Sequence, residues 1–126
     1  MKICPAPTKP VPILIGGHSN VALRRAARVA DGFIHAGGTF EDLAATVKRI
    51  EGYRRDFGRE QMPFEYQSMS AEAFNVEGVR KLEDLGIHEA IVAFRNPYEG
   101  GVDTQTLDEK IGALNWFAEN VIQKAR

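Results

Sequence analysis

The residues best suited to chemistry form a short loop, Gly16, Gly17, His18 and Ser19, that follows an apolar run and precedes a helical pattern. Glycines let the backbone approach a ligand closely, and the first N–H groups of a helix have no partner within the helix. Because the helix dipole also favours negative charge there, such a loop can bind a phosphate. The same pattern fits a tight turn in which Ser19 only caps the helix. On the local pattern alone both interpretations stay open, and the cap is slightly favoured.

A serine nucleophile is the alternative chemistry at this loop. Residues 17–21, Gly-His-Ser-Asn-Val, nearly match the G-x-S-x-G turn that places a hydrolase serine between a strand and a helix. However, Val21 stands where the second glycine is needed for close packing of helix and strand. His88, the later histidine that a triad would need, begins a predicted strand instead of following one. A serine hydrolase is therefore the minor alternative.

The other polar residues carry weaker signals. His35 ends a predicted strand, where barrel enzymes place their sites, but a structural role is favoured. Glu65 fits the interior and the outer face of its strand equally well. Arginines 24, 25 and 28 give the first helix a basic side of the kind that is usually solvated. None of these residues is an obvious general acid or base, so the catalytic residues stay unassigned.

Alternating strands and helices must position these residues. Apolar runs predict strands at 11–15, 32–36, 64–70 and 87–94, the first of them buried on both faces. Helical spacing predicts helices at 20–30, from Thr39 through Ile50, at 79–85, and at 107–121, where a single apolar stripe is expected. We expect the first helix to end at Asp31-Gly32 and the third at Gly86. Residues 1–10, rich in proline, form an extended lead-in.

This order predicts an α/β fold: four βα units with parallel strands and outer helices. We treat residues 1–126 as a single domain. Four units could form an open sheet or half of a TIM-type (β/α)8 barrel, whose full form takes about 250 residues.

Composition limits the partners. The chain has 126 residues, 44% of them hydrophobic, and a formal net charge of −1, which argues against a nucleic-acid surface. Cys4 is the only cysteine, and no spacing of Cys and His suits a zinc site, so no metal is expected. No run is apolar enough for a signal peptide or a membrane helix. The cytoplasm is the expected location, and a small neutral or anionic molecule is the expected ligand.

Residues 10–34 carry a specific resemblance. The run Pro-Val-Pro-Ile-Leu-Ile-Gly-Gly-His-Ser at 10–19, followed by Ala-Leu-Arg-Arg-Ala-Ala-Arg-Val-Ala-Asp-Gly-Phe-Ile at 22–34, closely resembles the luciferase-like monooxygenases. The resemblance continues through the Gly37-Gly38-Thr39 loop and the closing helix with Trp116 and Phe117. It implies a barrel oxidoreductase that uses FMN or a deazaflavin coenzyme of the F420 type and acts on a small-molecule substrate.

The resemblance also implies which residues hold the cofactor. Its phosphate would lie beside Gly16, Gly17, His18 and Ser19, which would supply backbone and hydroxyl donors. Gly37, Gly38 and Thr39 would form a second contact, since this loop also joins a strand end to a helix start. For Thr39 itself a capping role is favoured, because acidic residues follow it.

The resemblance covers only the C-terminal half of the family's barrel. In the family, the N-terminal half supplies much of the pocket for the flavin ring and the substrate cavity. A half-barrel would expose two strand edges, which favours a homodimer or a partner half-barrel. Two hypotheses follow: half of an oxidoreductase, or a non-catalytic, dimerising half-barrel that binds a phosphorylated ligand.

Overall fold

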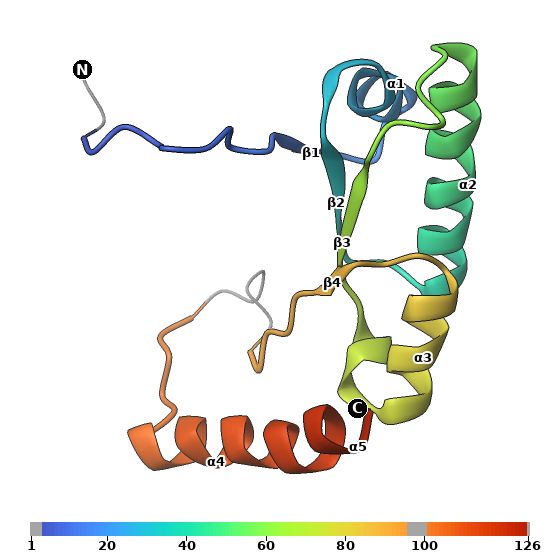
Figure 1. Cartoon of the computed structure of the whole chain (residues 1–126). Helices are drawn as coiled ribbons and strands as arrows, with labels where there is room; N and C mark the ends of the chain where they lie inside the picture. The colour runs from blue at the N-terminus through green and yellow to red at the C-terminus, as the bar shows by residue number, and fades with distance from the viewer. Residues whose placement is uncertain (1–3, 96–100, 126) are drawn as a thin grey trace.

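The computed structural model of the chain describes residues 4–95 and 101–125 (Figure 1). Four parallel strands in the order β1-β2-β3-β4 form one sheet, and α1, α2 and α3 lie on one side of it. The elements are β1 (Leu14–Gly16), α1 (Asn20–Val29), β2 (Gly32–Ala36), α2 (Phe40–Asp56), β3 (Glu65–Met69), the 3-10 helix η1 (Ala71–Phe74), α3 (Val76–Asp84), β4 (Glu89–Ala90), α4 (Leu107–Phe117), the π-helical turn η2 (Ala118–Ile122) and α5 (Gln123–Ala125). The predicted (βα)4 order is confirmed.

The core lies between the sheet and these three helices. Alternate residues of a strand point to opposite faces, and Phe33 and Tyr66, which are partners in the β2–β3 ladder, are both buried against the helices. The helices contribute most of the other buried apolar side chains, among them Leu23, Ala26 and Ala27 of α1, Leu43, Val47 and Ile50 of α2, and Leu82 of α3. The opposite face of the sheet carries half-buried residues such as Ile34 and Gln67. The core therefore belongs to the outer layer of the half-barrel.

Both outer strands are shorter than predicted. Val11 and Ile13 are 63% and 64% exposed, and β1 begins only at Leu14, so the prediction of a strand at 11–15 buried on both faces is wrong. At the other edge β4 contains only Glu89 and Ala90 of the predicted 87–94. The cause is common to both: an edge strand has one neighbour, which fixes only the residues that it pairs with. Residues 4–10 have no helix or strand and are exposed, as expected for a lead-in.

The helix ends follow the predicted signals in part. Gly86, with φ +85°, follows Leu85, the C-cap of α3, and so marks the end of this helix as predicted. The first helix ends at Val29, one residue earlier than predicted, because its C-cap Ala30 is extended. The Asp31 carboxylate accepts a hydrogen bond from the N–H of Ile13 (2.8 Å). Gly32 already belongs to β2, where a Cβ atom would lie 2.5 Å from the carbonyl oxygen of Glu65. This glycine permits close pairing of β2 and β3.

The last helix differs most from its prediction. Leu107, Ile111 and Leu114 are exposed in α4, and Val121 is the buried member of the predicted stripe. The π-helical turn η2 inserts an extra residue per turn, which rotates the residues after it relative to those before it. In Figure 1, α4 lies beyond the lower end of the sheet instead of against its helix-covered face. The single predicted stripe is therefore divided between solvent and core. Part of the preceding loop, residues 96–100, lies outside the described residues.

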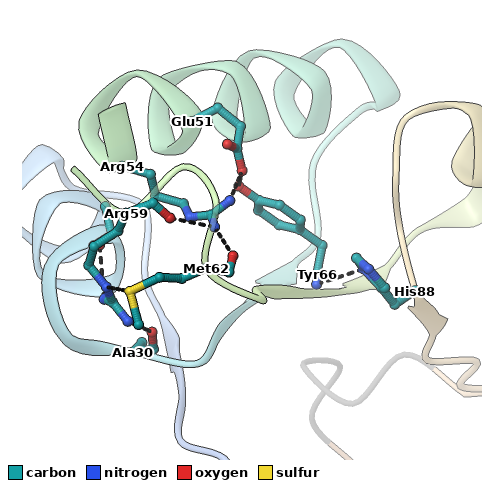
Figure 2. A network of polar contacts seen from close by, with 8 residues as sticks. Ala30, Glu51, Arg54, Arg59, Met62, Tyr66 and His88 are labelled. Carbon is teal, nitrogen blue, oxygen red and sulfur yellow. Dashed lines mark hydrogen bonds and ion pairs between the residues drawn. The ribbon is translucent and has the colours of Figure 1, made fainter. Parts of the chain in front are cut away.

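A polar network ties α2 to β3 (Figure 2). The buried guanidinium of Arg54 contacts the Glu51 carboxylate at 2.7 Å and donates to the carbonyl oxygens of Arg59 and Met62. Glu51 also accepts a hydrogen bond from the Tyr66 hydroxyl (2.6 Å). Burial, together with this carboxylate, raises the pKa of Tyr66 well above its usual range, so the hydroxyl keeps its proton. The network fixes the αβ loops, at the end of the sheet opposite the glycine loops.

The same network reaches α1. The guanidinium of Arg59 donates to the carbonyl oxygens of Ala27 (3.1 Å) and Ala30 (3.0 Å), at the C-terminal end of that helix. Helix C-termini have unpaired carbonyl groups and a partial negative charge, both of which a guanidinium satisfies. The chain after α2 therefore holds the C-terminal end of α1 in place.

Candidate functional site

Both predicted glycine loops border one cleft at the C-terminal end of the strands. The cleft has a volume of about 260 Å³. His18 comes from the loop after β1, while Gly37 and Gly38 come from the loop after β2. Its remaining walls include His35, Asp42 and Arg49. Two segments that the sequence separates by about twenty residues are thus brought to one place.

The first loop requires its glycines. A Cβ atom on Gly17 would lie 2.9 Å from Ala22 Cβ, and the φ of Gly17 is +126°, which only glycine adopts without strain. A Cβ atom on Gly16 would meet Ile34 Cγ2 at 3.1 Å. The backbone at this turn therefore lies close to both the following helix and the neighbouring strand, whose side chains leave no room for a Cβ atom at either glycine.

Ser19 caps α1. Its Oγ accepts a hydrogen bond from the N–H of Ala22 (3.2 Å), and its carbonyl accepts one from Leu23 (3.0 Å). The cap interpretation of Ser19 is thus confirmed, and its bonding is not that of a hydrolase nucleophile beside a base. Within the described chain, the N–H groups of Asn20 and Val21 have no hydrogen-bond partner. The first turn of α1 also contains no acidic residue. The N-terminus of α1 therefore combines two N–H donors with the positive end of the helix dipole, and both favour an anion.

The second loop is capped by its own helix, although the N–H groups of Phe40 and Glu41 have no partner in the described chain either. Asp42 Oδ2 accepts hydrogen bonds from the N–H (3.0 Å) and the hydroxyl (3.2 Å) of Thr39, while Thr39 Oγ1 accepts one from the N–H of Asp42 (3.2 Å). This capping box confirms the favoured interpretation of Thr39. The hydrogen bond from the Thr39 N–H, more than any other contact, lowers the pKa of Asp42, so its carboxylate is charged at neutral pH.

His35 lines the cleft beside both loops. Its side chain is 4% exposed, and its ring lies edge-on to the ring of His18, with 5.8 Å between centroids. Its Nδ1 is buried and has no hydrogen-bond partner, so His35 is not the satisfied structural histidine that the sequence favours. Burial, then the nearby His18, lowers the pKa of His35, although Asp42 opposes this shift. The ring is therefore neutral at pH 7.

Arg49 is a site residue that sequence reasoning missed. Its guanidinium donates to Oδ1 of Asn20, the first residue of α1, and the Tyr53 hydroxyl donates to the same oxygen (3.2 Å). Arg49 and Tyr53 are one helical turn apart, so both face α1. This i, i+4 pair is visible in the sequence, but its meaning depends on the packing of α1 against α2.

The other candidates lie outside the cleft. Arg25 and Arg28 are exposed, as expected, whereas Arg24 stacks on the rings of Tyr53 (5.0 Å) and Phe57 (5.5 Å). Glu65 lies on the face of the sheet away from α1–α3 and accepts a hydrogen bond from Gln67 Nε2 (2.6 Å). His88 is exposed, and its Nδ1 accepts from the N–H of Tyr66 (3.1 Å). These contacts support the fold and not the cleft.

Neither a metal-binding group nor a membrane-spanning helix is found among residues 4–95 and 101–125. These residues contain no group of three or more His, Cys, Asp or Glu side chains that could hold a metal ion. The helices of the same ranges also include none that is long and apolar enough to cross a membrane.

Comparison with known structures supports the fold. The coenzyme F420 dependent tetrahydromethanopterin reductase from Methanopyrus kandleri matches with a TM-score of 0.64 and 13% sequence identity. The match covers 92% of this chain and 51% of that chain. At this identity the likeness shows the fold alone: the chain has the fold of about half of a (β/α)8 barrel.

Comparison with known sequences supports the family. The uncharacterized protein Rv0940c of Mycobacterium tuberculosis and the uncharacterized protein Mb0965c of Mycobacterium bovis are each 50% identical to this chain over 123 residues. The match covers 98% of this chain and 42% of each relative, so the chain spans less than half the length of these proteins. The family model for luciferase-like monooxygenases matches residues 1–74. With more than half of its residues matched, this chain belongs to the luciferase-like monooxygenase family.

Proposed function

We propose that this chain holds the phosphate end of a flavin or deazaflavin cofactor for an oxidoreductase reaction. The observation that carries the proposal is the first glycine loop. Gly16 and Gly17 let the backbone turn tightly into α1, and the N–H groups of Asn20 and Val21 at the start of that helix have no partner in the described chain. A phosphate group supplies the acceptors and the negative charge that this helix end lacks.

The site residues have different roles in this proposal. Backbone N–H groups at Gly17 and His18 and at the start of α1 would bind phosphate oxygens, and the Ser19 hydroxyl proton would add a further donor. Gly37 and Gly38 would form the opposite wall, close to the ribityl chain. Thr39 is engaged by Asp42, so its contact with the cofactor is the least supported of the seven expected contacts.

The cofactor, when bound, supplies the redox chemistry by accepting or donating a hydride or by activating oxygen. The residues of this chain bind and orient it. Fixing the phosphate at the C-terminal rim of the strands would direct the ring toward the mouth of the barrel, where such enzymes bind substrate. The fold match to a coenzyme F420 dependent reductase favours a deazaflavin, whereas the family as a whole leaves FMN equally open.

A complete pocket requires a second half-barrel. Val11 and Ile13 beside the edge strand β1, and Leu107, Leu114 and Trp116 on α4, are exposed apolar residues of a kind that association normally covers. We propose that another half-barrel, from a longer chain or from a second copy, pairs with this one. The alternative of a dimer that binds phosphate without catalysis shares the same site and differs only in lacking redox activity.

Titration with the two cofactors tests the proposal. FMN and coenzyme F420 are added separately to the purified chain, their fluorescence is followed, and the mass of the protein in solution is measured in parallel. We expect saturable quenching by at least one cofactor and weaker binding by the Ser19→Ala variant. Failure of a folded oligomer to bind either cofactor at millimolar concentration would refute a cofactor role. Binding without oxidation of any substrate would favour the non-catalytic alternative.

A further inference from the structure

We propose that His35 and Arg49 form the phosphoryl-binding end of the cleft, a role that rests on the proposed function. His35 would donate to a phosphoryl oxygen through Nδ1, and Arg49 through guanidinium N–H groups that Asn20 does not use. Neither residue belongs to the glycine loops, and both lie on the cleft that the two loops border. The ligand is identified by its chemistry: a phosphate ester at the end of the ribityl chain.

The unsatisfied nitrogen of His35 is the first observation. A buried polar atom without a hydrogen bond destabilises the folded chain, so such atoms are rare and need an explanation. Nδ1 of His35 is such an atom, in a side chain that is 96% buried yet contributes to the wall of the cleft. Gly38 lies close to this ring: a Cβ atom there would be 3.6 Å from His35 Cε1. A ligand acceptor in the cleft would satisfy the nitrogen.

The position of Arg49 is the second observation. Its contact with Asn20 brings the guanidinium to the N-terminus of α1, beside the N–H groups that lack a partner in the described chain. A guanidinium has five N–H donors in a planar fork that matches two phosphoryl oxygens. Arg49 is exposed, so a positive charge that binds no ligand is well solvated there. Arg49 therefore adds positive charge near the N-terminus of α1.

The one carboxylate on the cleft does not cancel this arrangement. Asp42 carries a negative charge, but it is directed to the N–H and hydroxyl of Thr39 at the start of α2. It lies on the side of Gly38, whose missing Cβ would be 3.3 Å from Asp42 Oδ2. The carboxylate thus disfavours an anion at the second loop and favours the part of the cleft lined by His18 and Arg49.

The test compares FMN with riboflavin, which has the same ring and ribityl chain but no phosphate. We expect the wild-type chain to bind FMN at least about tenfold more tightly than riboflavin, since charge-assisted hydrogen bonds account for the difference. Arg49→Met and His35→Leu should each reduce this preference to about threefold or less and leave riboflavin binding unchanged. Arg49→Lys should keep most of the preference, because the charge is retained. Lys48→Met, one position away on α2, is the matched control.

The outcomes separate this inference from the cofactor proposal. If FMN binds and its preference over riboflavin is unchanged in both Arg49→Met and His35→Leu, the assignment of the two residues is wrong and the cofactor proposal stands. If neither flavin binds, inorganic phosphate is titrated while the ring nitrogens of His35 are followed by NMR. A saturable shift that Arg49→Met abolishes would support the phosphoryl site without a flavin, and no shift would overturn it.

Discussion

The two glycine loops have nearly the same sequence signature and differ in what the structure leaves available. After β1, Gly17 is confined by Ala22, and the following helix has no acidic residue in its first turn. After β2, a Cβ atom on Gly37 would have no neighbour within 4 Å, and Asp42 already occupies the start of the helix. The first loop therefore favours an anion from outside the chain, whereas at the second the carboxylate of Asp42 already supplies a negative charge.

This difference shows that a glycine pair before a helix does not by itself define an anion site. The third residue of the following helix distinguishes the two loops: it is Ala22 in α1 and Asp42 in α2. A carboxylate at that position accepts a hydrogen bond from the N–H of the N-cap residue and repels a second negative charge, although the first two N–H groups of both helices have no partner in the described chain.

The largest expected effect comes from adding one methyl group to each loop. Gly17→Ala would place Cβ 2.9 Å from Ala22 Cβ at a φ of +126°. It should lower the free energy of unfolding by about 1–3 kcal/mol and weaken FMN binding more than tenfold, roughly. Gly37→Ala, with open space and a φ of +76°, should cost about 1 kcal/mol and affect binding less. Thermal melts and fluorescence titrations measure both. Equal losses in the two variants would contradict the comparison.

Removing each cap should separate stability from binding. Thr39→Ala breaks the capping box of α2 and should lower the free energy of unfolding by about 1 kcal/mol, with FMN affinity unchanged. Ser19→Ala should have a similar effect on stability and should also weaken binding. Urea denaturation and titration of the two variants provide the test. A clear loss of FMN affinity in Thr39→Ala would show that the second loop contacts the cofactor directly.

A carboxylate introduced into the first loop should make it resemble the second. Val21 is 76% exposed in the first turn of α1, so Val21→Glu can interact with the helix dipole without disturbing the core. It should stabilise the chain by about 0.3–1 kcal/mol and weaken FMN binding severalfold. Val29→Glu, at the exposed C-terminal end of the same helix, should instead destabilise the chain and leave binding unchanged. A Val21→Glu variant that binds FMN normally would argue against an anion at α1.

The smallest expected effect is the pH dependence that His35 contributes. Burial, and next the nearby His18, lowers the pKa of His35, so the unfolded chain binds a proton more readily than the native one. Stability should therefore rise with pH up to the ordinary value of about 6.5 and decrease as pH falls below it. NMR titration of the His35 ring should show a pKa below the ordinary histidine value of about 6.5. A pKa at or above the ordinary value would contradict the buried environment.

The order of elements could be predicted from the sequence because it depends on local patterns. Helical spacing of small apolar residues gave α1, and Ser19, Thr39 and Gly86 marked helix ends as the structure has them. The lengths of β1 and β4 could not be predicted, since an apolar run such as 11–15 does not indicate whether it lies at a sheet edge.

The contacts that complete the cleft depend on tertiary packing. Arg49 meets Asn20 across 29 residues, and the unsatisfied nitrogen of His35 is defined by what surrounds it and not by its neighbours in sequence. The loops that border the cleft could be predicted because glycine, serine and threonine act locally. The side chains that distinguish one loop from the other could not.

Helix α1 is fixed at both ends by residues of α2 and the turn that follows it. Arg49 and Tyr53 hold Asn20 at the N-terminus, and Arg59 holds the carbonyl groups of Ala27 and Ala30 at the C-terminus. A helix restrained in this way cannot tilt or slide to meet a ligand, so its N-terminal donors are already in position before an anion arrives. Association there would require little loss of conformational entropy, and affinity would depend mainly on the enthalpy of the contacts.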